Sequence, residues 1–403
     1  MQTTGGMFLS PGAYSGEEKG GGRMKKRWAA LLAAAVLAAV LLPARSWAVE
    51  LPVEAQAALL MEKTTGQVLY AKNEHEQLEP ASVTKVMTLL LAMEALDEGR
   101  IRYDDTVTVS AYAASMGGSQ VFLSEGEQIT VEDLFKAICV ASGNDASVAM
   151  AEHIAGVTEL FVDQMNARAK QLGMNDTHFV NCTGLPAEGH VTSAWDIALM
   201  SRELILHHPD IRRFTTIWMD TLRGGSFQLS NTNKLIRFYD GATGLKTGST
   251  DAAGFCISAT AERDGMELIA VIMKGQTADQ RNTDAKTLLN YGFSTYALAE
   301  IAPQEPLAPV PVRLGAEDAV QPVLPSGSTL LVEKTKAGQL TQSVELQAEV
   351  EAPVAAGQAL GTLTVRAGDE VLLELPLQAE QAVEKLSWGG MLTRLLRCAF
   401  LAG

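Results

Sequence analysis

The stretch Pro80-Ala81-Ser82-Val83-Thr84-Lys85-Val86-Met87-Thr88 contains the only Ser-x-x-Lys motif of this chain. A serine hydroxyl becomes a nucleophile when a nearby base takes its proton. Residues three apart lie on the same face of a helix, so Lys85 can reach the Ser82 oxygen if this segment is helical. The apolar spacing predicts a helix over residues 83–96, with Ser82 near its N-terminus. There the unpaired amides and the helix dipole favour developing negative charge.

Two further short motifs follow in a fixed order. Ser142-Gly143-Asn144 comes 60 residues after Ser82, and Lys246-Thr247-Gly248 comes 164 residues after it. Either motif alone is compatible with a plain structural role, a helix-capping turn for the first and a strand edge for the second. Together with Ser-x-x-Lys, the ordered set resembles that of penicillin-binding proteins and serine β-lactamases.

Apolar segments from residue 53 to residue 300 alternate between strand and helix patterns. The predicted strands are 57–61 and 64–70 around a turn, then 254–261 and 266–273 around Arg263-Asp264-Gly265. Thr130, followed by Glu132-Asp133, predicts the start of a helix over 134–140 that delivers Ser142 at its end. Further helices are predicted over 145–154, ending at Gly156, and over 284–298.

The N-terminal region has the pattern of a secretory signal peptide. Met24-Lys25-Lys26-Arg27 precedes an apolar run of 15 residues, 28–42, and Ser46-Trp47-Ala48 offers small residues at the two positions that a signal peptidase reads. We therefore expect a signal peptide at 24–48, secretion across the cytoplasmic membrane, and a non-native extension at 1–23 with translation starting at Met24. The alternative is an N-terminal membrane anchor, although the run is short for a membrane span.

The charge balance is acidic. The chain has 32 Lys and Arg against 47 Asp and Glu, a net charge of −15, and without residues 1–48 it would have 26 against 45, a net charge of −19. Binding to nucleic acid requires a basic surface that neutralises phosphates. We therefore expect no nucleic-acid partner.

Cysteine and histidine are placed without the spacing of a metal site. The four cysteines, Cys139, Cys182, Cys256 and Cys398, include no C-x-x-C pair, and the only adjacent histidines are His207 and His208. Cys139 and Cys256 lie in apolar surroundings and are expected to be buried free thiols. We expect no metal and no cofactor.

The composition changes at Ile301. Four prolines fall within residues 302–312, and the alternating segments 329–332, 343–347 and 370–375 predict a small β-sandwich domain over 301–380. The last segment, 381–403, predicts an amphipathic helix with one apolar face and one polar face: Trp388, Met391, Leu392, Leu395, Leu396 and Ala399 against Thr393, Arg394 and Arg397. We interpret it as an interfacial membrane anchor, with a helix docked on the β domain as the alternative.

The sequences that flank the motifs are more specific than the motifs themselves. It includes Ala141-Ser142-Gly143-Asn144-Asp145-Ala146, Asn181-Cys182-Thr183-Gly184-Leu185, Asn231-Thr232-Asn233-Lys234-Leu235 and the run from Asp240 to Gly248. At these residues the chain resembles the low-molecular-mass penicillin-binding proteins, specifically the serine-type D-alanyl-D-alanine carboxypeptidases. The resemblance implies an α+β catalytic domain over 49–300, with an antiparallel sheet flanked by helices, followed by the small β domain and the terminal helix.

The resemblance also implies a role for each matched residue. Ser82 would attack the carbonyl between two terminal D-alanines, Lys85 would be the base if burial and Lys246 lower its pKa, and Ser142 and Asn144 would complete the proton relay and hold the substrate amide. Lys246 and Thr247 would bind the terminal carboxylate, Gly248 would let substrate lie along the strand, and the amides of Ser82 and Ser249 would form an oxyanion hole. Some relatives carry histidine where this chain has Ser249.

Arg281 falls where the family places an arginine that assists carboxylate binding, although an exposed surface arginine is the commoner case. The implied partners are peptidoglycan stem peptides ending in D-Ala-D-Ala, β-lactam antibiotics as covalent inhibitors, and the membrane surface.

Four other functions share part of this pattern. A serine β-lactamase needs a glutamate to activate the deacylating water, and no Glu-x-x-Leu-Asn lies between Asn144 and Lys246. A Ser-His-Asp hydrolase is disfavoured because the chain has no Gly-x-Ser-x-Gly. A transpeptidase passes the acyl group to an amine, and the sequence distinguishes it only poorly from a carboxypeptidase. A non-catalytic peptidoglycan-binding or β-lactam-sensing module would not need the intact catalytic positions.

Overall fold

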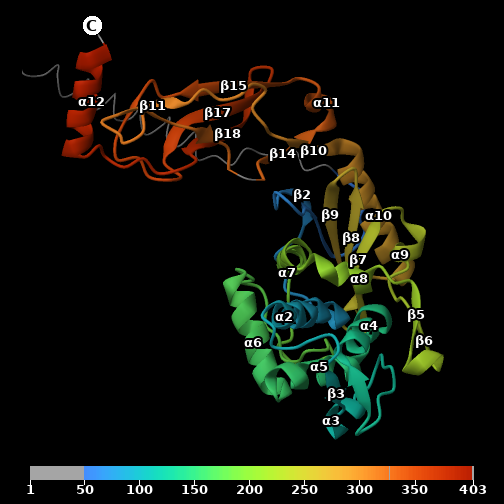
Figure 1. Ribbon diagram of the computed structural model, residues 1–403. Helices are drawn as coiled ribbons and strands as arrows, with labels where there is room; N and C mark the ends of the chain where they lie inside the picture. The colour runs from blue at the N-terminus through green and yellow to red at the C-terminus, as the bar shows by residue number, and fades with distance from the viewer. Residues whose placement is uncertain (1–49, 326, 402–403) are drawn as a thin grey trace, which may run out of the picture. The chain divides into compact units, whose positions relative to one another are not determined.

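A computed structural model of the chain describes residues 50–325 and 327–401. The proposed signal peptide and N-terminal extension therefore lie outside the described residues. The predicted α+β class is confirmed. A five-stranded antiparallel sheet has the order β2-β1-β9-β8-β7 (Figure 1), with the bounds Val68–Lys72, Ala57–Glu62, Met266–Gly275, Gly254–Arg263 and Ala242–Thr250.

The central strand β9 shows why both faces of this sheet are covered. Side chains alternate between the two faces of a strand, and nearly every residue of β9 is buried. Ile269, Val271 and Met273 belong to the hydrophobic core on one face, whereas Leu268 and Ile272 belong to the core on the other. A continuous apolar run of this kind is typical of a strand enclosed between two helical layers.

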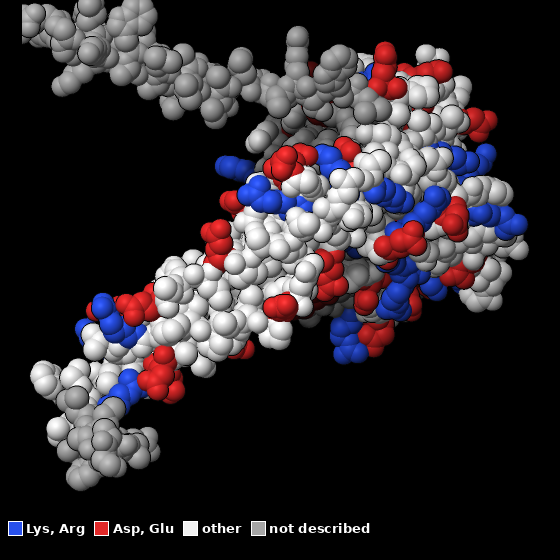
Figure 2. Space-filling model, turned by 90° about the horizontal axis from the view of Figure 1, so that it is seen from above, with Lys and Arg blue, Asp and Glu red and all other residues white. Residues whose placement is uncertain are grey.

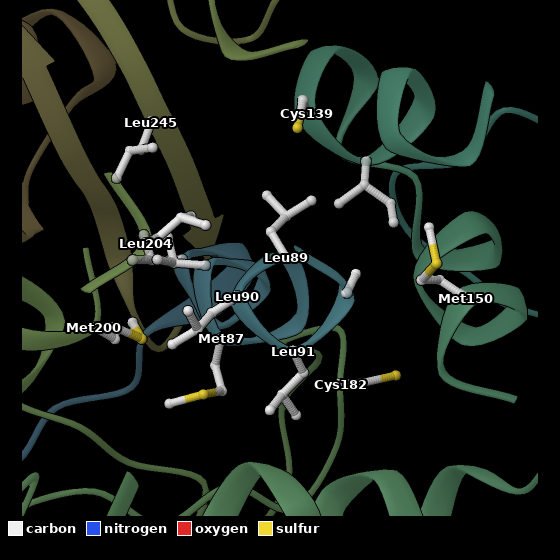
Figure 3. Close-up of a cluster of buried hydrophobic side chains, with 14 of the residues drawn as sticks. Met87, Leu89, Leu90, Leu91, Cys139, Met150, Cys182, Met200, Leu204 and Leu245 are labelled. Atoms are coloured by element: carbon white, nitrogen blue, oxygen red, sulfur yellow. The ribbon is translucent and has the colours of Figure 1, made fainter. Parts of the chain in front are cut away.

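The two faces of the sheet are covered by different helices. Helix α10, Ala278–Thr295, packs on β9, β8 and β1, and α7, Ala194–His207, packs on β1 and β9. The larger core adds α2 (Lys85–Asp97), α4 (Val131–Ala141), α5 (Asn144–Ala155) and α6 (Thr158–Gln171). Figure 3 shows Met87, Leu89, Leu90 and Leu91 of α2 meeting side chains from α4, α5 and α7 at the centre of this core.

Short elements complete the part of the chain before β10: the 3₁₀ turns Ala81–Thr84, Pro209–Ile211 and Arg223–Gly225, the helices α3 (Ala111–Ala114), α8 (Arg212–Thr215) and α9 (Leu235–Phe238), and the strands β3 (Thr106–Thr108), β4 (Gln128–Thr130), β5 (Met219–Leu222) and β6 (Phe227–Ser230). Strands β3 and β4 pair with each other, as do β5 and β6.

Most of the predicted elements are confirmed. Thr130 caps α4, since its hydroxyl accepts a hydrogen bond from the Asp133 amide, and α5 ends at Gly156 as expected. The β8–β9 hairpin turns at Asp264 and Gly265, which both have positive φ. The first hairpin turns at a glycine, as predicted, since Gly66 adopts φ 71°. Its second strand runs from Val68 to Lys72 and so begins and ends later than the predicted 64–70.

The predicted helix over 284–298 is wrong at both ends. Helix α10 starts at Ala278 because the Thr277 hydroxyl accepts the Gln280 amide and caps it. It stops at Thr295, and β10, Tyr296–Glu300, pairs antiparallel with β14, Thr329–Glu333. The apolar spacing of 296–298 therefore belongs to a strand whose paired residues lie 29 to 37 positions further along the chain, from the pair Glu300 and Thr329 to the pair Tyr296 and Glu333, which local periodicity cannot reveal.

Besides the β10–β14 pair, the described residues of the C-terminal β region form two small sheets. One has the order β12-β11-β16 (Ala319–Val320, Val310–Arg313, Val350–Glu351), and the other has the order β13-β18-β17-β15 (Pro322–Val323, Glu370–Ala379, Ala359–Ala367, Leu340–Leu346). One core cluster contains buried residues of both sheets, among them Val312, Leu360 and Ala379. A short helix, α11 at Lys334–Ala337, follows β14.

The last helix, α12, spans Trp388–Leu401, and the side chains beyond Arg394 lie outside the described part. It begins later than the predicted segment 381–403, because residues up to Leu386 pair with the β region. Val383 bridges to Val354 and is 1% exposed, and the Leu386 amide donates to the Leu314 carbonyl at 2.8 Å. Among the described residues, no helix is both long and apolar enough to cross a membrane.

Charged side chains of both signs are interspersed on the face shown in Figure 2. Cys139, Cys182 and Cys256 are buried free thiols, as predicted for Cys139 and Cys256. Burial raises the pKa of both Cys139 and Cys182 to about 12, so these thiols stay protonated at neutral pH.

Candidate active site

Ser82 lies in the 3₁₀ turn Ala81–Thr84, which leads directly into α2, so the predicted helix over 83–96 begins as a 3₁₀ turn and becomes α-helical at Lys85. The turn is fixed by Thr84, whose hydroxyl donates to the Ala81 carbonyl at 2.9 Å and lies 2.8 Å from His190 Nε2. The Val180 amide donates to His190 Nδ1 at 3.0 Å, so Nε2 carries the proton and donates to Thr84. Burial lowers the pKa of His190 to about 4, which keeps this imidazole neutral.

Lys85 is completely buried and its amine contacts three oxygens. Nζ lies 2.9 Å from Ser82 Oγ, 2.7 Å from Asn144 Oδ1 and 2.7 Å from the Thr183 carbonyl. The two carbonyl oxygens can only accept hydrogen bonds. In a neutral amine they occupy both N–H groups, and the lone pair is then left for the Ser82 hydroxyl.

The surroundings favour the neutral form of Lys85. Burial lowers its pKa well below the ordinary value, and the charge of Lys246 lowers it further, while Cys182 and Asp145 act in the opposite direction. A lysine with a depressed pKa is a competent base near neutral pH. The predicted condition on Lys85, burial together with Lys246, is therefore present.

Ser142 and Asn144 lie where α4 ends and α5 begins. Ser142 is 3% exposed and has φ 62°, a left-handed conformation that turns the chain between the two helices. Asn144 donates from Nδ2 to the Gly117 carbonyl at 2.7 Å, so its Oδ1 is oriented toward Lys85. Within the described part of the chain, the Ser142 hydroxyl forms no hydrogen bond with Ser82 or Lys85.

Lys246 and Thr247 lie on β7, the edge strand of the sheet. Lys246 is 1% exposed and its Nζ donates to the Thr247 carbonyl at 3.0 Å. Burial lowers the pKa of Lys246 to about 7, and the nearby Arg281 charge contributes in the same direction. The Thr247 hydroxyl donates to Thr232 Oγ1 at 2.7 Å. This edge therefore carries positive charge and hydroxyl groups next to Lys85.

Gly248 is required for close packing against the turn that carries Ser82. A Cβ at this position would lie 2.8 Å from the Ser82 nitrogen and 2.9 Å from the Pro80 oxygen, closer than real Cβ atoms approach. The missing side chain therefore lets β7 pack against the turn that carries Ser82. The role of Gly248 in letting substrate lie along the strand stays a prediction. Ser249, the next residue, is exposed and pairs with Phe255 of β8.

Arg281 is buried, so the alternative of an exposed surface arginine is wrong. It is 5% exposed and donates from Nε and Nη2 to Asn282 Oδ1 at 3.2 and 3.0 Å. Burial lowers its pKa, and no ion pair joins it to a carboxylate in the described part of the chain. A buried guanidinium with no acidic partner is well suited to an anionic ligand.

Sequence reasoning missed the segment that completes the Lys85 site. Asn181 Oδ1 accepts hydrogen bonds from the Thr183 and Gly184 amides at 3.1 and 2.7 Å, which aims the Thr183 carbonyl at Lys85. Gly184 has φ 82°, and a Cβ there would lie 1.8 Å from the Ala81 oxygen. The signal was visible as Asn181-Cys182-Thr183-Gly184-Leu185, but a backbone carbonyl leaves no trace in residue type.

Comparisons with known proteins agree with this geometry. Residues 45–277 match the family model D-alanyl-D-alanine carboxypeptidase, and residues 301–385 match the C-terminal domain of penicillin-binding protein 5. The chain is 43% identical over 353 residues to the D-alanyl-D-alanine carboxypeptidase DacF of Bacillus subtilis, covering 86% of this chain and 90% of the relative. It is 37% identical over 366 residues to DacD of Salmonella typhimurium, covering 85% and 89%.

Solved structures show the same relationship. Penicillin-binding protein 5 from Haemophilus influenzae has a TM-score of 0.74 at 30% identity, over 83% of this chain and 98% of that one. Penicillin-binding protein D2 from Listeria monocytogenes, in its ampicillin-bound form, has a TM-score of 0.56 at 32% identity, over 60% and 99%. This chain is therefore a serine hydrolase that belongs to the D-alanyl-D-alanine carboxypeptidase family of penicillin-binding proteins.

Proposed function

We propose that the chain removes the terminal D-alanine from peptidoglycan stem peptides through an acyl-enzyme on Ser82. The observation that carries this proposal is the Lys85 amine, buried, depressed in pKa and 2.9 Å from the Ser82 hydroxyl. Asn144 and the Thr183 carbonyl occupy its two N–H groups, which leaves its lone pair for the serine proton.

The reaction would proceed in two steps. Lys85 takes the Ser82 proton while Oγ attacks the carbonyl carbon between the two D-alanines. The C–N bond then breaks, and the proton returns to the departing amine through Lys85 and Ser142, which releases D-alanine. Water hydrolyses the Ser82 ester, regenerates the hydroxyl and frees the shortened peptide.

Two groups of residues would hold the substrate. Lys246, Thr247 and Arg281 would bind the terminal carboxylate, since they bring two buried cations and a hydroxyl to the β7 edge. The amides of Ser82 and Ser249 would stabilise the oxyanion, a contribution of about 3 kcal/mol for each donor in comparable sites. Gly248 allows this edge to approach the Ser82 amide.

The same site would be acylated by β-lactams. One protein of this fold, penicillin-binding protein D2 of Listeria monocytogenes, has been solved in ampicillin-bound and cefotaxime-bound forms. We further propose that the mature protein is secreted, with the catalytic region at 49–300, the β region at 301–380 and a C-terminal helix that lies on the outer face of the membrane. Trp388 at 88% exposure and Leu392 at 60% supply apolar surface for that contact.

The decisive test is D-alanine release from a peptide ending in D-Ala-D-Ala by the purified secreted form. We expect release by the wild type and none by Ser82→Ala, because the ester cannot form. Release that persists in Ser82→Ala would overturn the mechanism. Adding an acceptor amine distinguishes a carboxypeptidase from a transpeptidase, which would yield the amide product instead of the free acid. A penicillin hydrolysis assay distinguishes a carboxypeptidase from a β-lactamase.

A further inference from the structure

A cavity of about 400 Å³ lies beside the catalytic residues, and none of the roles above uses it. Its walls come from α3, α5, α6 and the loop that contains Asn181 and Thr183. The cavity thus shares a wall with the active site, because the Thr183 carbonyl accepts the hydrogen bond from Lys85 Nζ at 2.7 Å.

The cavity is also bordered by the segment that holds Asn144. The Gly117 carbonyl accepts from Asn144 Nδ2, and Met116, the preceding residue, lines the cavity. A Cβ on Gly118 would lie 2.8 Å from Asn144 Nδ2 and 3.5 Å from Cδ2 of Leu185, another residue of the cavity wall. The cavity therefore opens next to both segments that position the catalytic amide and amine.

The direction of the substrate follows from the proposed carboxylate site. With Lys246 and Arg281 holding the terminal carboxylate at the β7 edge, the residues that precede the scissile bond would run past Asn144 and Thr183, which lie beside Ser82 through their shared contacts with Lys85 Nζ. The side chain of the residue before D-Ala-D-Ala then comes to lie at this cavity.

The lining indicates what kind of side chain fits. Tyr112, Met116, Val148 and Val162 give the cavity an apolar wall, and Glu159 and Asp163, four residues apart on α6, supply two carboxylates. The wall has no basic residue, and neither carboxylate forms an ion pair with any residue that the structure describes. An aliphatic chain that ends in an ammonium group complements such a surface, because its methylenes pack while its charge reaches the carboxylates.

We propose that this cavity is a specificity subsite for the residue that precedes D-Ala-D-Ala, and that Glu159 and Asp163 select a side chain ending in a primary amine. The inference rests on the proposed carboxypeptidase function. It assigns these two residues to substrate selection and gives them no part in bond making or breaking.

Two matched peptides test the proposal directly: Nα-acetyl-L-Lys-D-Ala-D-Ala, with a free side-chain amine, and its Nε-acetylated form. We expect the wild type to have a higher kcat/KM for the free amine, by roughly tenfold for two charge pairs and roughly threefold for each one. The double variant Glu159→Gln, Asp163→Asn should bring this ratio close to one, mainly through KM, and leave the acetylated peptide unaffected.

Glu188→Gln is the matched control. Glu188 is an exposed acid on a second cavity that also touches Leu185, so this variant removes one negative charge, as each single variant Glu159→Gln or Asp163→Asn does, without altering the proposed subsite. We expect it to keep the wild-type ratio. A ratio that falls as far in Glu188→Gln as in Glu159→Gln or Asp163→Asn alone would mean that only the general negative field attracts the amine, and the subsite would be rejected.

A β-lactam pair gives a second readout that needs no turnover. Ampicillin differs from benzylpenicillin by one amino group on the side chain, so the ratio of their acylation rate constants should fall in the double variant and persist in Glu188→Gln. Equal ratios in the wild type and the double variant, for peptides and for penicillins, would overturn the subsite while leaving the carboxypeptidase function intact. If the wild type cleaves neither peptide, the proposed function fails and this inference fails with it.

Discussion

At the scale of single residues, the site is built from buried cations without acidic partners. Lys85, Lys246 and Arg281 are each at most 5% exposed, and none forms an ion pair within the described part of this acidic chain. Buried charges are normally paired, because desolvation without a partner is costly. Here burial lowers the pKa of all three groups, which leaves one lysine to act as a base and the other cations to await an anionic substrate.

The pKa shifts predict a bell-shaped pH dependence of kcat/KM. Activity should rise as Lys85 loses its proton, because only the neutral amine is a base. It should fall above about pH 7, where Lys246 loses the charge that binds the terminal carboxylate. Steady-state rates with a D-Ala-D-Ala peptide and with its C-terminal amide check this expectation. The amide has no carboxylate, so a falling limb that remains with it would contradict the assignment to Lys246.

Replacing Lys246 should raise the free energy of unfolding and abolish peptide cleavage. In the folded protein its pKa is about 7, below the unfolded value of 10.5, so the charged form is disfavoured on folding. Lys246→Met removes that cost, and its gain in stability over the wild type should be largest below about pH 7 and fade between about pH 7 and 10.5. Denaturant unfolding at several pH values measures it, with loss of peptide cleavage expected alongside. A gain in unfolding free energy that grows with pH would contradict a lowered pKa for Lys246.

At the scale of elements, the active site depends on close approach between segments far apart in sequence. The loop at Gly184 lies against the turn of Ala81 and Ser82, and β7 reaches the same turn at Gly248. Neither approach leaves room for a Cβ. The nucleophile is therefore held by two backbone contacts that only glycine permits.

Two glycines with nearly the same positive φ separate this packing effect from conformational strain. Gly184 and Gly189 have φ 82° and 78°, but a Cβ on Gly184 would lie 1.8 Å from the Ala81 oxygen, whereas on Gly189 the nearest atom is 3.9 Å away. Gly189→Ala should cost about 1 kcal/mol from its left-handed backbone alone. Gly184→Ala should lose well over that amount, together with acylation by penicillin. Equal unfolding free energies for the two variants would show that the contact at Ala81 is unimportant.

At the scale of the whole molecule, the described chain is a catalytic region followed by a β region and α12. The C-terminal helix exposes Trp388 and Leu392, while Arg394 pairs with Asp318 and donates to the Gly315 carbonyl. The contacts of Arg394 belong to a docked helix, and the exposed apolar residues fit a membrane surface. Both interpretations from the sequence thus correspond to particular side chains.

A truncation decides between them, provided that it starts in the right place. Removing residues from 383 onward would delete Val383, which is buried in the β region, so the chain should instead end at Leu386. We expect the protein ending at Leu386 to keep its melting temperature and peptide cleavage and to stop sedimenting with lipid vesicles. Trp388→Ala with Leu392→Ala should weaken sedimentation in the same direction. Continued sedimentation of the truncated protein would remove the helix as the anchor.

The sequence by itself determined the local elements and most of the catalytic residue types. Short motifs contain most of the catalytic residues: Ser82, Lys85, Ser142, Asn144, Lys246 and Thr247. Helix caps such as Thr130 act within one turn of the chain. Both kinds of feature can therefore be predicted from residues that are close in sequence. The order of the motifs also indicated the family.

Only the tertiary structure decided how these residues work together. Four features arise where segments that are distant in sequence meet: the carbonyl that completes the Lys85 site, the burial of Arg281, the close packing at Gly248 and the end of α10. Local patterns describe what a residue can do and which face it lies on. Burial, and the pKa that burial sets, depend on what packs against it, and that is fixed only when the sheet, the helices and the loops come together.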